Sequence, residues 1–190
     1  IRNCDWSSDV CSSDLRLIRS LGVATDTRVV LIGFGGVPLD GVPFDAAKRL
    51  QGYHFVHSGP VPPGYRNLTS YLQLGIPFPV ILASVDAVMT KPGYSTIVEA
   101  VTHARPVLYI RRHTFADEDG IVDYLHRYGR AREIAQDAFF AGAWDEPLEA
   151  LLSSPPPDEP DTSPNGAVED RKSTRLNSSH SSVSRMPSSA

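Results

Sequence analysis

The chain has 190 residues and a formal net charge of −4, and its two ends differ in composition from its centre. Residues 1–15 and 170–190 are Ser-rich and resemble translated sequencing-adapter sequence, with natural disordered tails as the alternative. The body between them is more acidic than the whole chain, which argues against a nucleic-acid-binding surface of clustered Lys and Arg. Both cysteines lie in the leading segment, so the body offers neither a disulfide framework nor a thiolate metal site.

One domain is expected over residues 16–153, followed by a Pro-rich acidic tail over 154–169. No apolar run approaches the ~20 residues of a membrane helix, so we expect no membrane span in this chain and a cytoplasmic location. The natural N-terminus is expected to be missing, which leaves a lost signal peptide open.

Strands and helices alternate along the body, with continuous apolar runs for the strands and helical spacing for the helices. In chain order the pattern predicts strand 28–34, helix 44–52, strand 53–59, a weaker strand near 67–72, helix 77–85, strand 86–90, helix 95–104, strand 105–110, helix 117–129, a short strand 132–134 and helix 144–154. Repeated strand-helix units of this length predict an α/β fold, a parallel sheet with helices on both faces.

Two glycine-rich loops directly follow strands. Gly35 and Gly36 end the first strand, and K-P-G-Y-S-T, residues 91–96, follows the strand at 86–90. Because ligands of parallel α/β sheets collect at the carboxyl ends of the strands, both loops are expected at one crevice. Neither loop has the G-x-G-x-x-G spacing of a dinucleotide site or the G-x-x-x-x-G-K-[ST] spacing of a phosphate loop, which disfavours those two cofactor classes.

The second loop has two interpretations. Gly93 would let a ligand approach the backbone, and the amides of residues 94–96 would point out of a helix start whose dipole favours negative charge. The structural alternative is a T-x-x-E capping box, in which the Glu99 carboxylate caps the Thr96 amide. We expect both interpretations to hold. The capping box would stabilise the start of the helix, and binding of an anionic ligand would be the reason for the glycine turn.

Three segments resemble the C-terminal, donor-binding half of GT-B glycosyltransferases: D-A-V-M-T-K-P-G-Y-S-T-I-V-E-A, then R-P-V-L-Y-I-R-R, then the acidic F-A-D-E-D before a helix. The resemblance covers residues 28–152 and is most specific in the first segment. It is nearest to glycosyltransferase family 28 and UDP-glycosyltransferase-like enzymes, and to the glycosyltransferase-like region that precedes the kinase in plant-type arabinokinases. It implies a Rossmann-like parallel sheet that forms one half of a GT-B fold.

The resemblance also implies a site for a nucleotide sugar, UDP-linked, which is a substrate and not a cofactor. Its diphosphate would lie on the amides at the helix start, and Glu99 would accept hydrogen bonds from the ribose hydroxyls. Asp117 and Glu118 stand where the family has an acidic or amide residue beside the transferred sugar, although they could instead complement a helix dipole. The expected nucleotide-sugar-binding residues are Gly35, Gly36, Lys91, Gly93, Tyr94, Ser95, Thr96, Glu99, Asp117 and Glu118.

The chain departs from this family in two places. Ser95 stands where relatives often have glycine, and no glutamine follows the acidic pair, so sugar selectivity is not implied. No divalent-metal motif is present, and the charge of a leaving diphosphate would be neutralised by amides, the helix dipole and Lys91, Arg111 or Arg112.

An acceptor hydroxyl requires a general base in an inverting transfer. His113 is the one body histidine expected near the crevice, whereas His54, His57 and His126 are expected to pack or to lie at the surface. In GT-B enzymes the base usually belongs to the N-terminal domain, which is expected to precede this chain, so we name no catalytic residue.

The leading hypothesis is the donor half of a glycosyltransferase that moves a hexose from a nucleoside diphosphate to an acceptor. The fragment alone is expected to be inactive. Two alternatives are half of a nucleotide-sugar 2-epimerase and a non-catalytic or kinase-linked sugar-nucleotide-binding domain. The expected partners are the small-molecule nucleotide sugar and the N-terminal domain of the same protein.

Overall fold

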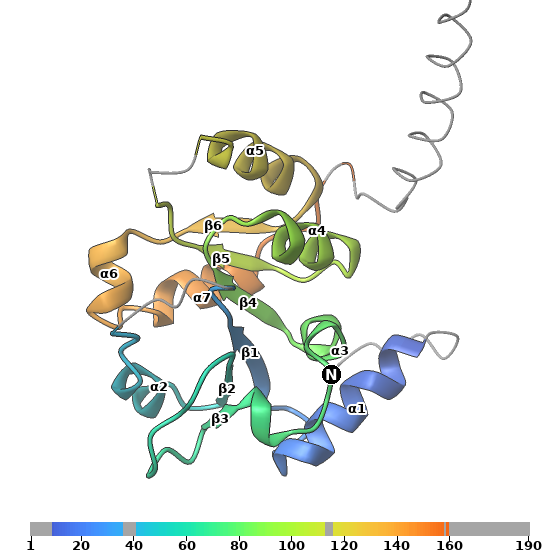
Figure 1. Ribbon diagram of the computed structural model, residues 1–190, viewed down its shortest axis with the longest axis vertical. Coiled ribbons are helices and arrows are strands. Elements are labelled where there is room, and N and C mark those ends of the chain that lie inside the picture. The colour runs from blue at the N-terminus through green and yellow to red at the C-terminus, as the bar shows by residue number, and fades with distance from the viewer. Residues whose placement is uncertain (1–8, 36–40, 113–115, 158, 160–190) are drawn as a thin grey trace, which may run out of the picture.

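The computed structural model describes residues 9–35, 41–112, 116–157 and 159, with side chains from residue 15 onward. These residues form a six-stranded parallel sheet with helices on both faces (Figure 1), as predicted. In chain order the elements are α1 (Asp9–Leu21), β1 (Arg28–Ile32), α2 (Asp45–Arg49), β2 (Tyr53–His57), β3 (Leu68–Ser70), the 3₁₀ helix η1 (Tyr71–Gln73), α3 (Phe78–Ser84), β4 (Ala87–Thr90), α4 (Tyr94–Thr102), β5 (Val107–Tyr109), α5 (Glu118–Tyr128), β6 (Ala131–Glu133), α6 (Gln136–Phe140) and α7 (Asp145–Leu152).

The six predicted strands and five predicted helices are confirmed, most of them shorter than the sequence pattern indicated. Helices α1, η1 and α6 were not predicted. Across the described residues, no helix has both the length and the hydropathy of a membrane-spanning segment.

Strand β1 lies in the centre of the sheet, whose order is β3-β2-β1-β4-β5-β6. In its register Val30 stands opposite Phe55 of β2 on one side and Ala87 of β4 on the other. Every β1 residue after Arg28 is buried. Because both faces of this strand are covered, each position favours an apolar side chain, which explains the uninterrupted apolar run in the sequence.

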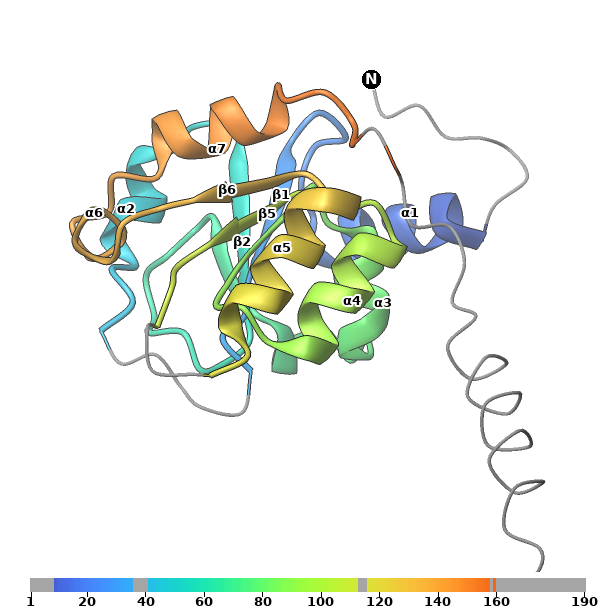
Figure 2. The same ribbon diagram turned by 90° about the horizontal axis from the view of Figure 1, so that it is seen from above.

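The sheet separates two hydrophobic cores (Figure 2). Helices α1, α3, α4 and α5 cover one face, and α2, α6 and α7 cover the other. Successive side chains of β1 pack alternately into the two cores, because they point to opposite faces of the sheet. Leu31 lies in the first core and Ile32 in the second. In the second core Trp144 is fully buried, and its indole N–H donates to the Phe139 carbonyl at 2.9 Å, so its polar atom is satisfied.

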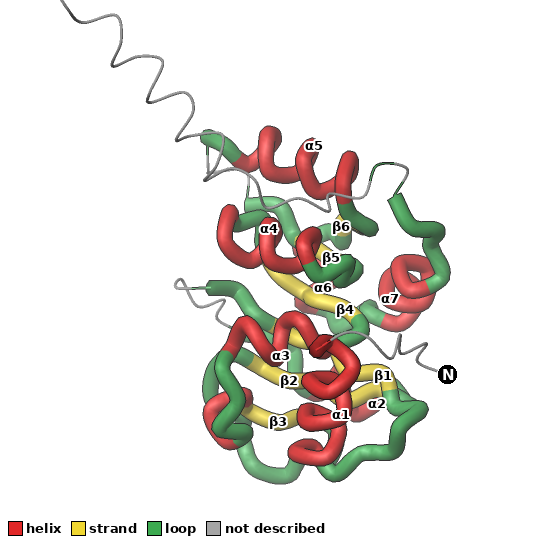
Figure 3. The backbone as a smooth tube through the Cα atoms, turned by 90° about the vertical axis from the view of Figure 1, so that its right-hand side faces the viewer, coloured by secondary structure: helices red, strands yellow, loops and turns green. Residues whose placement is uncertain are grey.

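Helix α1 lies beside α3 on the first face (Figure 3). Leu17 and Ile18 from its second half are buried in the core. The helix begins at Asp9 and therefore crosses residue 15, the predicted end of the leading segment. The origin of the flanking segments stays a prediction.

Candidate functional site

A cavity of about 420 Å³ opens at the carboxyl edge of the sheet, between the loops that follow β1, β4 and β5. After β1 the chain runs to α2 on one face of the sheet, and after β4 it runs to α4 on the other face. A crevice therefore lies between the two connections at this edge of the sheet. The two glycine loops therefore meet in one cavity, as predicted. Its described lining residues are Phe34, Gly35, Lys91, Gly93, Tyr94, Ser95, Thr96 and Arg112.

Helix α4 begins in the wall of this cavity, with Gly93 as its N-cap residue. The Ile97 N–H donates to the Gly93 carbonyl at 3.0 Å and makes the first hydrogen bond of the helix, so the amides of residues 94–96 point out of its N-terminal end. The predicted capping box is wrong, because Thr96 lies inside the first turn and not at the N-cap. Among the described residues, no side chain caps this helix.

The fold does not require glycine at position 93. Its φ of −147° is extended backbone that any residue adopts, and among the described atoms an added Cβ would meet only the Lys91 carbonyl, at 3.9 Å. The missing side chain instead leaves the start of α4 open to close approach by a ligand. Gly35 differs, since its φ of 66° lies in the left-handed region and the turn after β1 favours glycine for that reason.

Two cations, Lys91 and Arg112, lie in the cavity wall, and its described lining residues include no carboxylate. Burial and, to a smaller extent, repulsion by Arg112 lower the pKa of the Lys91 ammonium. An anion bound between these side chains would favour the charged form of Lys91. The positive side chains and the helix dipole thus favour a negatively charged ligand.

Arg112 connects the loop after β5 with its surroundings. Its backbone N–H donates to Oε1 of Glu118 at 2.8 Å, and its guanidinium Nη2 donates to the Pro92 carbonyl at 2.8 Å. Glu118 is the first residue of α5 and is only 3% exposed. The Glu118 carboxylate is therefore engaged with the backbone of the loop.

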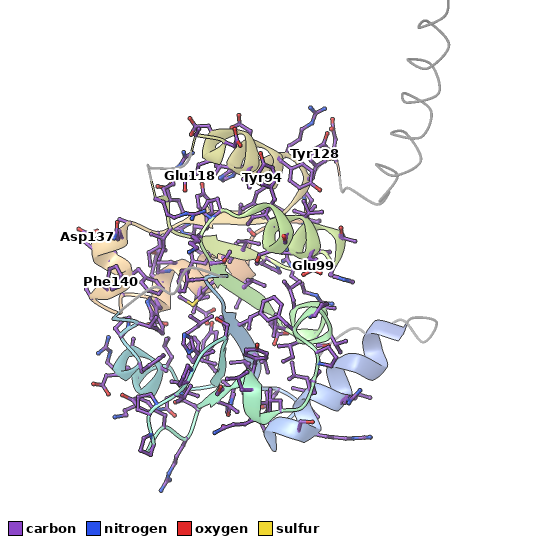
Figure 4. The ribbon with its side chains drawn as sticks, viewed as in Figure 1. Tyr94, Glu99, Glu118, Tyr128, Asp137 and Phe140 are labelled. Carbon is purple, nitrogen blue, oxygen red and sulfur yellow. The ribbon has the colours of Figure 1, made fainter. Side chains whose placement is uncertain are left out.

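The other member of the acidic pair, Asp117, is exposed and occupies the N-cap position of α5. Partial burial, and then the charge and a hydrogen bond of Asp117, raise the pKa of the Tyr94 phenol. Tyr94, which is 56% exposed, thus lies between the starts of α4 and α5 (Figure 4) and is one of the residues that line the cavity.

Glu99 is half-buried in α4 and lies outside the set of residues that line the cavity. It follows Ser95 by one helical turn, so these two side chains share a face of the helix. Tyr94 lies about 140° away from Glu99 around the helix axis. Figure 4 shows Tyr94 on the side of α4 next to α5 and Glu99 on the side next to α3. A ligand at the helix start that contacts both would therefore extend across the end of α4.

Two expected residues, Gly36 and His113, lie outside the described residues. His54, His57 and His126 each have a hydrogen-bonding partner inside the fold, in agreement with the packing prediction. Burial lowers the pKa of both His54 and His57.

Sequence reasoning missed Phe34 as part of the cavity and did not separate Arg112 from its neighbour Arg111. The available signal for Arg112 was its position just past a strand that ends at the same edge of the sheet. For Phe34 the signal was its place directly before Gly35. Neither signal tells from sequence which side chain turns toward the cavity.

A larger cavity of about 610 Å³ lies at the opposite, amino-terminal edge of the sheet. Two of its polar residues, Lys48 and Asn67, contact other parts of the protein. Lys48 pairs with Asp45 at 2.8 Å, and the Asn67 amide donates to the carbonyl of Ala47 at 2.5 Å. Within the part of the chain that the structure describes, no three His, Cys, Asp or Glu side chains gather as metal ligands.

Comparison with known proteins gives one related sequence of defined activity and a group of related folds. No family model matches the chain. An L-arabinokinase of Arabidopsis thaliana is 28% identical over 143 residues, which are 73% of this chain and 13% of that protein.

The solved structures with a similar fold include two glycosyltransferases. CalG4, the calicheamicin glycosyltransferase, is 20% identical with a TM-score of 0.54, over 78% of this chain and 36% of that chain. The spinosyn rhamnosyltransferase SpnG, complexed with thymidine diphosphate, is 18% identical with a TM-score of 0.52, over 70% of this chain and 39% of that chain. The predicted Rossmann-like, GT-B type of fold is confirmed, and the chain spans well under half the length of these proteins.

Proposed function

We propose that this chain is the donor-binding domain of a glycosyltransferase and that its ligand is a nucleoside diphosphate sugar. The observation that carries the proposal is the cavity at the carboxyl edge, where the open start of α4 meets Lys91 and Arg112 without a carboxylate among the described lining residues. The fold shared with glycosyltransferases, one of them complexed with thymidine diphosphate, supports a nucleoside diphosphate as the anion.

The diphosphate would bind the amides of residues 94–96 with the loop at Gly35 and Gly36 on its other side. Glu99 would accept hydrogen bonds from the two ribose hydroxyls, because one carboxylate matches a vicinal diol. Asp117, which is exposed near Tyr94, would contact the sugar, whereas Glu118, the other predicted sugar contact, is buried. This arrangement uses both sides of α4, with the nucleoside toward α3 and the sugar toward α5.

In the transfer reaction the bond between the sugar and the diphosphate breaks, and negative charge develops on the departing phosphate oxygen. Amides and cations fixed around that oxygen stabilise the charge in the transition state. Lys91, Arg112 and the start of α4 would act in this way. The base that takes the acceptor proton would come from a further domain, in keeping with the share of the glycosyltransferase chains that this chain spans.

A second candidate function is a sugar-nucleotide-binding domain joined to a sugar kinase. The match to an L-arabinokinase over 143 residues favours it. In this case the same cavity would bind a sugar nucleotide, and the chemistry would take place elsewhere in the longer protein.

The test is calorimetric titration of the full chain with UDP, thymidine diphosphate and their hexose conjugates, for the parent protein and for Glu99→Gln. We expect binding of a nucleoside diphosphate that weakens about tenfold in the variant, as loss of a charged hydrogen-bond acceptor predicts. Uridine and thymidine without phosphates serve as control ligands and should not bind measurably.

Two results would overturn the proposal. A folded chain that binds none of the diphosphates has no donor site. If nucleoside and nucleoside diphosphate bind with equal affinity, the phosphates do not contribute to binding and the start of α4 is not the diphosphate site. Transfer to an acceptor, measured after the preceding domain is supplied, separates the glycosyltransferase from the kinase-linked candidate.

A further inference from the structure

We propose that Arg112 binds the diphosphate directly and that buried Glu118 is the positioning residue that holds Arg112 at the cavity. This inference rests on the proposed function and adds a specific cationic ligand to it. It also assigns Glu118 a role different from contact with the sugar.

Position is the first argument for Arg112. It lines the cavity together with the residues at the start of α4, although it comes from the loop after β5. Its Nη2 donates to the Pro92 carbonyl at 2.8 Å, directly beside the N-cap residue Gly93. A guanidinium carries five N–H donors, so a contact with one carbonyl is compatible with further hydrogen bonds to a phosphate. Its planar arrangement of donors also suits two phosphate oxygens at once.

The neighbouring arginine shows that this placement is specific to residue 112. Arg111 pairs with Asp119 at 2.5 Å and with Glu133 at 3.3 Å, and it does not line the cavity. These carboxylates raise the pKa of Arg111, and the hydrogen bond that Arg111 donates to Asp119 is the largest cause. Two consecutive residues of the same charge therefore have different surroundings, one in a network of carboxylates and one at the cavity.

Glu118 fixes the backbone from which Arg112 extends. Its Oε1 accepts the Arg112 N–H at 2.8 Å, and at 3% exposure its side chain is shielded from solvent. A buried carboxylate that accepts a backbone N–H restrains the direction in which the loop leaves β5. The same burial argues against contact with a sugar, because a ligand would have to displace this hydrogen bond to reach the carboxylate.

The test is calorimetric titration of the full chain with inorganic pyrophosphate and with UDP, in the parent protein and in three variants. Arg112→Gln should weaken both ligands about tenfold. Arg111→Gln is the matched control, since it removes the same charge one residue away, and it should change neither affinity more than twofold. Arg112→Lys keeps the charge but loses the planar donors and should recover only part of the affinity.

Glu118 is tested with two further variants. Glu118→Gln keeps an oxygen that can accept the Arg112 N–H and should bind pyrophosphate within about threefold of the parent protein. Glu118→Ala should show the full loss seen in Arg112→Gln. If Glu118→Gln instead weakens a UDP-hexose and leaves UDP and pyrophosphate unchanged, Glu118 contacts the sugar and the positioning role is wrong.

The outcomes separate this inference from the proposed function. If the parent protein binds neither pyrophosphate nor UDP, the donor site itself is refuted and the inference with it. If the parent protein binds and the Arg112 and Arg111 variants lose affinity equally or not at all, only the role of Arg112 is refuted. Thermal unfolding of each variant confirms that the compared proteins are folded, and Arg112→Lys provides the comparison if Arg112→Gln does not fold.

Discussion

The two edges of the sheet use polar groups in different ways. At the amino-terminal edge, polar side chains connect parts of the fold to each other. Arg28 and Tyr53 both donate to Oε1 of Glu149, at 2.8 and 2.5 Å, and so join two strands to α7. Asp86 accepts the Val29 N–H at 2.6 Å and joins β4 to β1.

At the carboxyl edge the polar groups surround a cavity. The amides at the start of α4 and the side chains of Lys91 and Arg112 converge there from two loops. The amino-terminal edge has the larger cavity, yet Lys48 and Asn67 in its wall contact other parts of the protein. The difference teaches that the chemistry of the cavity wall, more than the cavity volume, supports the proposed binding site. Changes at the amino-terminal edge should therefore alter stability, and changes at the carboxyl edge should alter binding.

The largest expected effect is that of Asp86→Ala at the amino-terminal edge. It leaves the Val29 N–H without its charged acceptor inside the sheet, which should lower the free energy of unfolding by about 3 kcal/mol. Urea denaturation followed by circular dichroism measures this loss. Diphosphate affinity of the folded variant should stay unchanged, and a parallel loss of affinity would break the distinction between the two edges.

The next effect concerns Tyr53. Burial and the hydrogen bond to Glu149 raise the pKa of its phenol to about 12. Because the folded-state pKa lies above that of the unfolded chain, the stabilisation is complete below about pH 10 and is lost as the pH rises toward about 12, by up to about 2 kcal/mol. Denaturation curves between these pH values should show this loss in the parent protein and a smaller one in Tyr53→Phe. If the free energy of unfolding falls equally with pH in both proteins, Tyr53 is not the source of the loss.

At the carboxyl edge, Gly93→Ala should weaken diphosphate binding about tenfold, because a methyl group would lie where a phosphate approaches the helix start. Stability should fall by no more than about 1 kcal/mol, since the backbone conformation suits alanine and only a favoured N-cap residue is lost. Calorimetry and denaturation on the same preparation compare the two quantities. A variant with normal binding and reduced stability would assign Gly93 to the fold alone.

The smallest expected effect is the pH dependence of binding through Lys91. Burial and Arg112 lower its pKa, so the ammonium loses its proton at a lower pH than an exposed lysine would. Since a diphosphate favours the charged form, affinity should fall by roughly threefold as the pH rises through the range below 10.5, and Lys91→Arg should remove this dependence. Titrations in two buffers with different ionisation enthalpies would report the proton uptake. The same pH dependence in both proteins would exclude Lys91 as its source.

The sequence predicts the order of elements well, because buried parallel strands are apolar at every position and glycines end the segments. The predicted capping box at the start of α4 is wrong for a physical reason. Thr96 and Glu99 have the spacing of a capping box, but the extended Gly93 already directs the chain into a helix at Tyr94. A spacing pattern records which residues could interact and not where the preceding loop places the first turn.

Elements that depend on distant contacts were missed. Helix α6 is short, and its Phe139 is buried against Phe34 and Trp144, whose rings lie 5.5 and 5.3 Å away. Such a helix is stabilised by packing more than by its own propensity. The different contacts of Arg111 and Arg112 cannot be predicted from the sequence for the same reason, since carboxylates on other elements determine where Arg111 lies.

The central position of β1 has a consequence for how this domain is synthesised. Among the six strands of this sheet, β1 leaves the ribosome first and β2 follows soon, but β4 begins about 55 residues after β1 ends. At typical rates of translation, β1 waits roughly 3 to 11 s for the partner of its second edge. During this interval Val30 and Ile32 lack their β4 neighbours, Ala87 and Met89. A ribosome that stalls before residue 90 would therefore present an apolar strand with an open edge, and such unpaired edges are prone to aggregation.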